Sequence, residues 1–297
     1  AKAQASLTYG GYTSLVYATG ILGGMIADRY LGYQRSIILG GLLMAVGCFM
    51  LLSPELHMFL IGLAVIVAGN GLFKPNISTM VGKLYAPNDV RRDSGFTIFY
   101  MGINAGAFVA PLITAVWIGA TYGYKYGFLA AAIGMIFGIA VFQVRKGMLG
   151  HVGQSPAGRE GWGPVLNVLV GAILLVPVIY FLLSQSEILG VVLLALFAGL
   201  AVYLIWSGYS ETSVQGQKYI AMFLLFTANI LFWALFEQAG ASLNFLAQDH
   251  VHAPFHFTLF QSANPLFIVL LAPVFAMMWP WLDKMNMNPS IPRKFAI

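Results

Sequence analysis

Two ionisable side chains, Lys74 and Glu237, lie deep inside long apolar segments of the sequence. At a rise of about 1.5 Å per helical residue, each falls within roughly 5 Å of the middle of its segment. Their heights across a bilayer differ by about 10 Å on the same arithmetic, so a direct ion pair requires tilted helices and extended side chains. A charged group in hydrocarbon is costly, and it normally faces protein or water at an ion, proton or substrate site. These two residues are therefore the first candidates for a functional site.

Polar or small residues recur at helical spacing around both charges. Around Glu237 they follow steps of 4, 4, 3 and 4 along one helical face, as Asn229, Trp233, Glu237, Gly240 and Asn244. Two further stripes comprise Asn70, Lys74 and Ser78, and Tyr9, Thr13 and Tyr17. Two amides in other apolar segments are Asn104 and Asn264. Three polar stripes in one bundle fit a central aqueous cavity better than a core packed against lipid.

Each of these residues also has a purely structural interpretation. A single membrane Asn more often holds helices together than it contacts a ligand, which weakens the case for Asn229 and Asn244. Aromatic residues such as Tyr17 and Trp233 fill bundles routinely, although their place in polar stripes favours a functional role. For a membrane Lys or Glu the balance favours function, because a buried charge without a task is poorly tolerated.

Prolines follow two of the polar residues directly, Pro75 after Lys74 and Pro265 after Asn264. A proline bends a helix and frees a backbone carbonyl, so both changes occur beside polar side chains. Discontinuous helices next to a site near the bilayer midplane are typical of secondary transporters. Prolines are also common in membrane helices in general, so their placement supports the other observations and proves little alone.

The elements that must position these residues are membrane helices. Hydrophobic residues make up 59% of the 297 positions and charged residues 8%, which excludes a soluble domain with a charged surface. Because backbone polar groups in lipid must be satisfied internally, the apolar runs predict an all-α, polytopic transmembrane bundle. We expect nine spans, at 8–27, 36–52, 56–82, 94–118, 126–144, 164–182, 188–206, 217–247 and 257–282.

A segment rich in Gly and polar residues, 146–163, divides the bundle. We expect an N-terminal bundle over 1–145, a linker with two accessory helices over 146–215, and the start of a C-terminal bundle over 216–297. With the loop of Arg29 and Arg35 in the cytoplasm, most of the 15 basic residues fall on that side. The net charge of +5 is therefore a topology signal that puts the linker in the cytoplasm, and not a footprint for nucleic acid.

Other function classes find little support. No His, Asp or Ser cluster lies at membrane depth, so we expect no catalytic residues, no metal site and no cofactor. His250, His252 and His256 form an H-x-H-x-x-x-H run, but in an outside loop, where a solvated loop is favoured over a weak metal site. Cys48 is the single cysteine, which excludes an intramolecular disulfide. A channel or a receptor is a further alternative.

Several motifs resemble known families. GGMIADRYLGYQR, residues 23–35, resembles the loop signature between the second and third spans of the major facilitator superfamily. Two more segments resemble the signature of the proton-dependent oligopeptide transporter (POT) family: GNGLFKPNISTMVGKLY, residues 69–85, and RRDSGFTIFYMGINAGAFVAPL, residues 91–112. FWALFEQAGASLN, residues 232–244, and FQSANPLFIVLLAP, residues 260–273, are similar to its seventh and eighth spans.

The resemblance implies a bundle of major facilitator type, with twelve core spans in two halves and, in bacterial members, two accessory helices between them. By that register this chain contains spans two to eight and the accessory pair, and lacks the first span and the last four. The implied function is proton-coupled symport of di- and tripeptides by alternating access across the bacterial cytoplasmic (inner) membrane. We further expect that protons are the coupling ion, that the protein lies in the lipid bilayer, that it binds no nucleic acid, and that it acts as a monomer.

The resemblance also implies roles for individual residues. Lys74 matches the lysine near the peptide carboxylate, and both Lys74 and Glu237 match residues of proton coupling and gating. The other matches are amides that hold the peptide, Asn104 and Asn264, pocket aromatics, Tyr17 and Trp233, and the cytoplasmic gate motif, Asp28, Arg29 and Arg35. A cation and an acid in one cavity would orient a zwitterionic peptide. The alternative is a carrier of nitrate or another small anion, in which Lys74 holds the anion.

Overall fold

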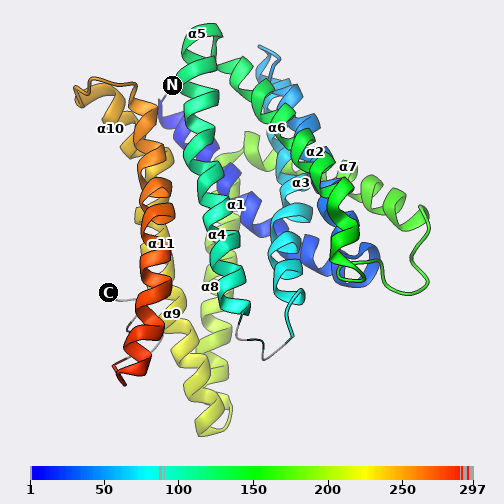
Figure 1. Cartoon of the computed structure of the whole chain (residues 1–297), viewed down its shortest axis with the longest axis vertical. Helices are drawn as coiled ribbons and strands as arrows, with labels where there is room; N and C mark the ends of the chain where they lie inside the picture. Colours follow the sequence, from blue (N-terminus) through cyan, green and yellow to red (C-terminus); the bar gives the residue numbers. More distant parts are fainter. Residues whose placement is uncertain (1, 87–88, 90, 288, 290–292, 294–297) are drawn as a thin grey trace.

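Long apolar runs separated by glycine and charged loops form helices that cross the height of the molecule (Figure 1). A computed structural model describes residues 2–86, 89, 91–287, 289 and 293. The long helices are α1 (Lys2–Ile26), α2 (Tyr33–Met50), α3 (Leu56–Lys83), α4 (Arg92–Pro111), α6 (Tyr124–Arg145), α7 (Gly163–Ser184), α8 (Ser186–Ser210), α9 (Ser213–Phe236) and α11 (Phe260–Lys284). The shorter elements are α5 (Ala120–Tyr122), α10 (Ser242–His250), the π-helices η1 (Ala27–Leu31) and η2 (Leu112–Gly119), and the 3-10 helices η3 (Lys146–Leu149), η4 (Glu237–Gly240) and η5 (Phe257–Leu259).

The predicted membrane bundle is confirmed. Eight helical segments in the described part of the chain are long and apolar enough to span a bilayer, and each coincides with one predicted span. The remaining predicted span, 8–27, corresponds to α1, which has 25 residues but carries several polar side chains in its first half. Helix α6 ends at Arg145 and α9 begins at Ser213, close to the predicted divisions at 145/146 and 215/216. The division into three parts itself stays a prediction, and its last part runs beyond Met287 into residues outside the described ones.

Two predicted spans are interrupted. The span 94–118 changes from α-helix to the π-helix η2 directly after Pro111, whose missing N–H and bulky ring loosen the hydrogen-bond ladder. The span 217–247 stops at Phe236, turns through η4 and resumes as α10. A Cβ atom on Gly240 would clash with the Tyr9 hydroxyl, so the close approach of α1 accompanies this break. The single helical face predicted to run to Gly240 and Asn244 is therefore wrong beyond Glu237.

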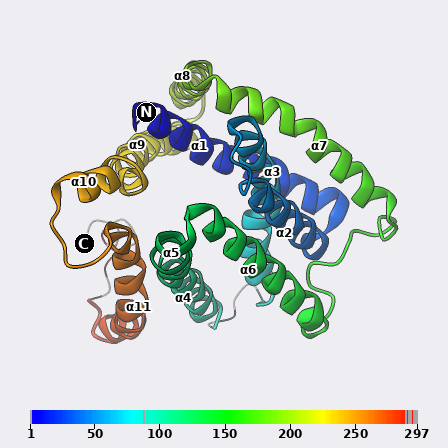
Figure 2. The ribbon, with the colours of Figure 1, turned by 90° about the horizontal axis from the view of Figure 1, so that it is seen from above.

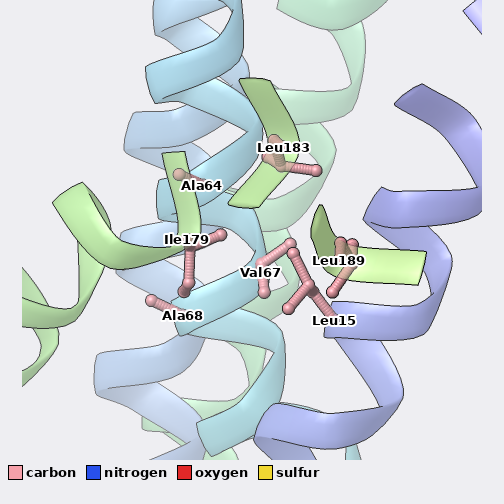
Figure 3. Packing of buried hydrophobic residues seen from close by; sticks show 7 residues of the cluster. All are labelled: Leu15, Ala64, Val67, Ala68, Ile179, Leu183 and Leu189. Atoms are coloured by element: carbon pink, nitrogen blue, oxygen red, sulfur yellow. The ribbon is translucent and has the colours of Figure 1, made fainter. Parts of the chain in front are cut away.

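The accessory helices α7 and α8 pack against α1 and α3. A buried apolar cluster joins all four helices (Figure 3), and it consists of Leu15, Ala64, Val67, Ala68, Ile179, Leu183 and Leu189. Between α1 and α3 the backbones come so close that a Cβ on Gly23 would clash with the Gly71 carbonyl. Small residues at a helix interface allow this distance, which is the usual way that membrane helices associate.

The remaining helices form the other side of the molecule. Seen from above, α9, α10 and α11 gather on one side, whereas α2, α3, α6 and α7 gather on the other, with α1 and α4 between them (Figure 2). The Ser262 hydroxyl of α11 donates to the Phe108 carbonyl of α4 at 2.9 Å, which fixes one of these contacts. Helices α1 and α4 thus lie between the C-terminal helices and the other helices of the N-terminal part.

The predicted topology can be tested by labelling introduced cysteines in a background that lacks Cys48. His151→Cys in the linker is expected to react only with reagent on the cytoplasmic side, and Gln185→Cys, between α7 and α8, only with reagent outside. Both native side chains are exposed, so access is controlled by the membrane alone. The expectation rests on the excess of basic residues in loops on one side. Labelling of His151→Cys from outside in sealed cells would invert the map.

Candidate substrate and proton site

Three predicted site residues meet where α1, α3 and α9 approach one another. The Lys74 ammonium lies 4.4 Å from the centroid of the Tyr17 ring, a distance typical of a cation–π contact. The Tyr17 hydroxyl in turn donates a long hydrogen bond, 3.5 Å, to Oε1 of Glu237. Tyr17 therefore stands between the cation and the carboxylate, with its ring toward one and its hydroxyl toward the other.

Trp233 completes this group on the α9 side, and we call Lys74, Tyr17, Trp233 and Glu237 the Tyr17 cluster. Its ring centroid lies 6.0 Å from that of Tyr17, with an angle of 58° between the planes. Trp233 also contacts Phe236 edge-on at 5.4 Å, so an aromatic wall leads along α9 to Glu237. About half of the Tyr17 side chain and 38% of Trp233 are exposed, which leaves both rings accessible to a ligand.

Lys74 and Glu237 do not pair directly. The ion pairs among the described residues are Lys2–Asp249 and Arg91–Asp89, and neither involves the two membrane charges. This agrees with the separation in height that their positions in the sequence predict. Lys74 consequently keeps its ammonium for another partner, apart from the face of Tyr17.

Glu237 has a second phenol partner that sequence reasoning did not select. The Tyr9 phenol also lies close to this site, because a Cβ atom on Gly240, three residues after Glu237, would clash with the Tyr9 hydroxyl. The two groups interact electrostatically, so both phenols near Glu237 come from α1. An ionised carboxylate can accept hydrogen bonds from two phenols at once, whereas a protonated one must also find an acceptor for its own proton. The signal for Tyr9 was present, because Tyr9 and Tyr17 lie on one polar stripe of α1. The contact with Glu237 became visible only once α1 and α9 were placed together.

The two predicted amides lie on the other contacting pair of helices, α4 and α11. Asn104 is 7% exposed, and its amide donates to the Tyr100 carbonyl of its own helix at 2.9 Å. Asn264 is exposed on α11, one residue before Pro265. No contact between either amide and the Tyr17 cluster is present among the interactions of the described residues. Their role in holding a substrate stays a prediction.

The predicted gate motif lies at the end of α1 that is predicted to face the cytoplasm, on η1 and the start of α2. Asp28 accepts a hydrogen bond from the Tyr33 hydroxyl, so its partner is a phenol and not a cation. The Arg35 guanidinium donates to three successive linker carbonyls, those of Arg159 at 3.3 Å, Glu160, and Gly161 at 2.8 Å. Arg35 thus holds the linker against this loop, a contact that the gate interpretation did not anticipate. The gate role of the motif stays a prediction.

Contacts between the N-terminal and C-terminal parts also occur at the end predicted to face outside. Lys2 at the start of α1 pairs with Asp249 of α10. The hydroxyl of Tyr124, at the start of α6, lies 3.4 Å from Nε2 of His256, a member of the histidine run. The other ring nitrogen of His256, Nδ1, lies 2.8 Å from the Thr258 hydroxyl. His256 therefore connects the start of α6 to the loop before η5 at this end.

Comparison with known proteins places this geometry in a family. Residues 34–297 match the PTR2 model, described as the POT family. The chain is 35% identical to "Peptide transporter YePEPT" of Yersinia enterocolitica subsp. palearctica, covering 100% of this chain and 63% of that protein. It is 36% identical to "Di-/tripeptide transporter" of Lactococcus lactis, covering 100% of this chain and 64% of that protein. The chain thus spans less than two thirds of the length of these relatives.

Solved structures agree with the sequence relatives. One titled "Crystal structure of peptide transporter POT in complex with sulfate" superposes with a TM-score of 0.77 at 38% identity, covering 99% of this chain and 62% of that one. Another, titled as tetrameric PepTSo2, superposes with a TM-score of 0.81 at 26% identity, covering 95% and 63%. The signature segments, the helical bundle and these matches together show that the chain belongs to the POT family.

Proposed function

We propose that this chain forms the translocation pathway of a proton-coupled symporter of di- and tripeptides in the bacterial cytoplasmic membrane. The observation that carries the proposal is the row formed by Lys74, Tyr17 and Glu237 across α1, α3 and α9. A fixed cation and a fixed acid on either side of an aromatic ring suit a substrate that carries both charges. The names of the relatives, which are peptide transporters, support the same substrate class.

Lys74 is the group proposed to bind the peptide carboxylate. Its ammonium rests on the Tyr17 face and has no carboxylate partner among the described residues, so a substrate carboxylate can approach it without displacing another ion. A charge-assisted hydrogen bond in a partly desolvated cavity is about twice as strong as a neutral one. Tyr17 and Trp233 would wall the site, and Asn104 and Asn264 would hold the peptide backbone or amino end.

Glu237 is the group proposed to carry the coupling proton. When ionised, it accepts the Tyr17 hydroxyl, with the Tyr9 phenol close by, and so ties α9 to α1 across the two parts of the molecule. Protonation removes the charge that these donors stabilise and weakens the tie. The break between α9 and η4 lies at this same residue, which gives the chain a local point of bending. Proton binding and the position of α9 would thereby be linked.

Alternating access requires the outer contacts to open in the other state. The Lys2–Asp249 pair and the Tyr124–His256 contact join the two parts at the end predicted to face outside. In an outward-open state these contacts would separate, while the loops at the cytoplasmic end would approach one another. Each ligand shifts this equilibrium only by its difference in affinity for the two states. The monomeric state and the domain division stay predictions.

The test of the proposed function is uptake of a labelled dipeptide by proteoliposomes that contain the full-length protein. An inward proton gradient is expected to drive accumulation above the external concentration, and a protonophore should abolish it. Unlabelled dipeptides should compete, whereas nitrate should not. Competition by nitrate without competition by dipeptides would instead favour the small-anion carrier, in which Lys74 binds the anion and Glu237 has no substrate to orient.

Removal of the Tyr9 hydroxyl offers a finer test. Tyr9→Phe is expected to lower proton-driven uptake by roughly twofold to tenfold, since a typical hydrogen bond contributes about 0.5–1.5 kcal/mol. Counterflow of peptide, which needs no net proton movement, should fall less. Tyr12→Phe is the matched control, because it removes a hydroxyl from the same helix without a bond to Glu237. Equal losses in both variants would show a general effect on α1.

A further inference from the structure

A second site candidate lies on the flank of the bundle, away from the Tyr17 cluster. A crevice of about 570 Å³ runs between α1, α3 and the accessory helix α7. Its walls are apolar along most of their length and include Leu22, Met25, Leu72, Gly171 and Leu175. Leu22 and Met25 are about half exposed, so the crevice is open along this flank. These features suit a hydrocarbon chain and do not suit a peptide.

One end of the crevice is basic and polar. Arg29 and Tyr30 of η1 line it there, together with Asn167 in the first turns of α7. The Arg159 guanidinium of the linker stacks on Tyr30, 4.6 Å from the ring centroid. The three linker carbonyls that Arg35 binds include that of Arg159, so the linker is held in place at this mouth. One end of the apolar crevice is therefore lined by Arg29, and Arg159 lies beside it on the ring of Tyr30.

The acids near this mouth do not neutralise the two arginines. Within the described part of the chain, neither Arg29 nor Arg159 belongs to an ion pair. Asp28 accepts the Tyr33 hydroxyl, and a carboxylate oxygen of Glu160 lies 3.1 Å from the Gly158 amide, which donates to it. The positive-inside orientation places the mouth at the cytoplasmic surface, where anionic lipid head groups are found.

The length of the crevice matches one leaflet. From Asn167 to Leu175 the rise along α7 is about 12 Å, close to the roughly 15 Å that separates the head-group region from the bilayer midplane. An acyl chain that starts at the arginines would therefore end near the middle of the membrane. A free phosphate ion would use the basic mouth but would leave the apolar crevice empty.

We infer that this crevice binds an anionic phospholipid of the cytoplasmic leaflet, with its phosphate on Arg29 and Arg159 and one acyl chain between α1, α3 and α7. Arginine is suited to the head group because its planar donors match phosphate oxygens. The bound lipid would connect the accessory helix, the linker and the loop that carries the predicted gate motif. This inference is independent of the proposed transport function, because it rests on residues that do not touch the Tyr17 cluster.

The experiment is native mass spectrometry of the delipidated full-length protein, titrated with phosphatidylglycerol or, in parallel, phosphatidylcholine. One phosphatidylglycerol should remain bound at collision energies that remove phosphatidylcholine. Arg29→Ala combined with Arg159→Ala should weaken phosphatidylglycerol binding by about fivefold per arginine, since each contributes about 1 kcal/mol near an anionic surface. Lys218→Ala, at an exposed lysine of α9 outside the crevice, is the control for lost charge.

A second variant fills the crevice and keeps both arginines. Gly171 lines it, and a Cβ there meets no atom within 4 Å, so Gly171→Leu should fold normally and exclude the acyl chain. Gly190→Leu on α8, where a Cβ also meets open space, is the control for size. The inference is overturned if phosphatidylcholine binds equally well, or if the double arginine variant and Gly171→Leu both bind phosphatidylglycerol like the wild type. It is also overturned if Gly171→Leu changes only the oligomeric mass, because the crevice would then be a contact between copies.

Discussion

Lys74→Ala is expected to abolish uptake of dipeptides while the protein still inserts and folds. The substitution removes the only ammonium in the Tyr17 cluster of the described residues, and with it the proposed partner of the substrate carboxylate. Hydrogen bonds to charged groups contribute about 1.5–3 kcal/mol, so peptide binding should weaken roughly tenfold to hundredfold. Lys74→Arg should not restore transport, because the planar guanidinium needs more room than the ammonium against the Tyr17 ring.

A change in the substrate separates binding from a structural role of Lys74. The wild type should strongly prefer a dipeptide to the same dipeptide with an amidated carboxyl end. Lys74→Ala should lose this preference, because neither ligand then has a cationic partner, and the two affinities should converge. Competition for equilibrium binding of one labelled peptide measures both affinities, because it does not require transport. If Lys74→Ala transports dipeptides normally, or discriminates the amide as well as the wild type does, the carboxylate is bound elsewhere.

Sequence reasoning located the membrane helices well because their signal is local. Each predicted span corresponds to a helical segment, although 94–118 and 217–247 are broken within, since long apolar runs must satisfy their backbone groups internally. The two breaks inside predicted spans were missed because each depends on a single residue or on a contact with another helix, which the apolar pattern of a span does not show. Pro111 opens the ladder into η2, and the approach of Tyr9 to Gly240 accompanies the break after Phe236.

The site was predictable as a set of residues but not as an arrangement. Lys74, Tyr17 and Glu237 stood out because polar groups in apolar segments are rare, although they come from three separate helices. That Tyr17 lies between the two charges depends on how α1 packs against α3 and α9, which no local pattern encodes. The hydrogen bonds from Arg35 to the linker carbonyls could not be predicted for another reason. Every residue carries a backbone carbonyl, and the position of that carbonyl depends on the fold.

Glu237→Gln is expected to abolish proton-driven accumulation of peptide while peptide exchange down its own gradient is impaired less. Glutamine matches the protonated carboxyl in shape, and its side-chain oxygen can still accept the Tyr17 hydroxyl. A glutamine amide does not bind or release a proton at physiological pH, so protonation can no longer weaken the contact between α9 and α1. Coupling should be lost, whereas the binding site at Lys74 stays intact.

The measurement compares proton-driven uptake with counterflow in the same proteoliposomes, at one peptide concentration. With an inward proton gradient, the wild type should concentrate peptide inside, and Glu237→Gln should only reach the external concentration. In counterflow, preloaded peptide should still exchange through the variant, because exchange requires rocking around a bound substrate but no net proton movement. Gln238→Ala, at the next residue of η4, controls for disturbance of the helix break. If Glu237→Gln still concentrates peptide in response to the proton gradient, Glu237 is not the coupling acid, and a different acidic residue must carry the proton.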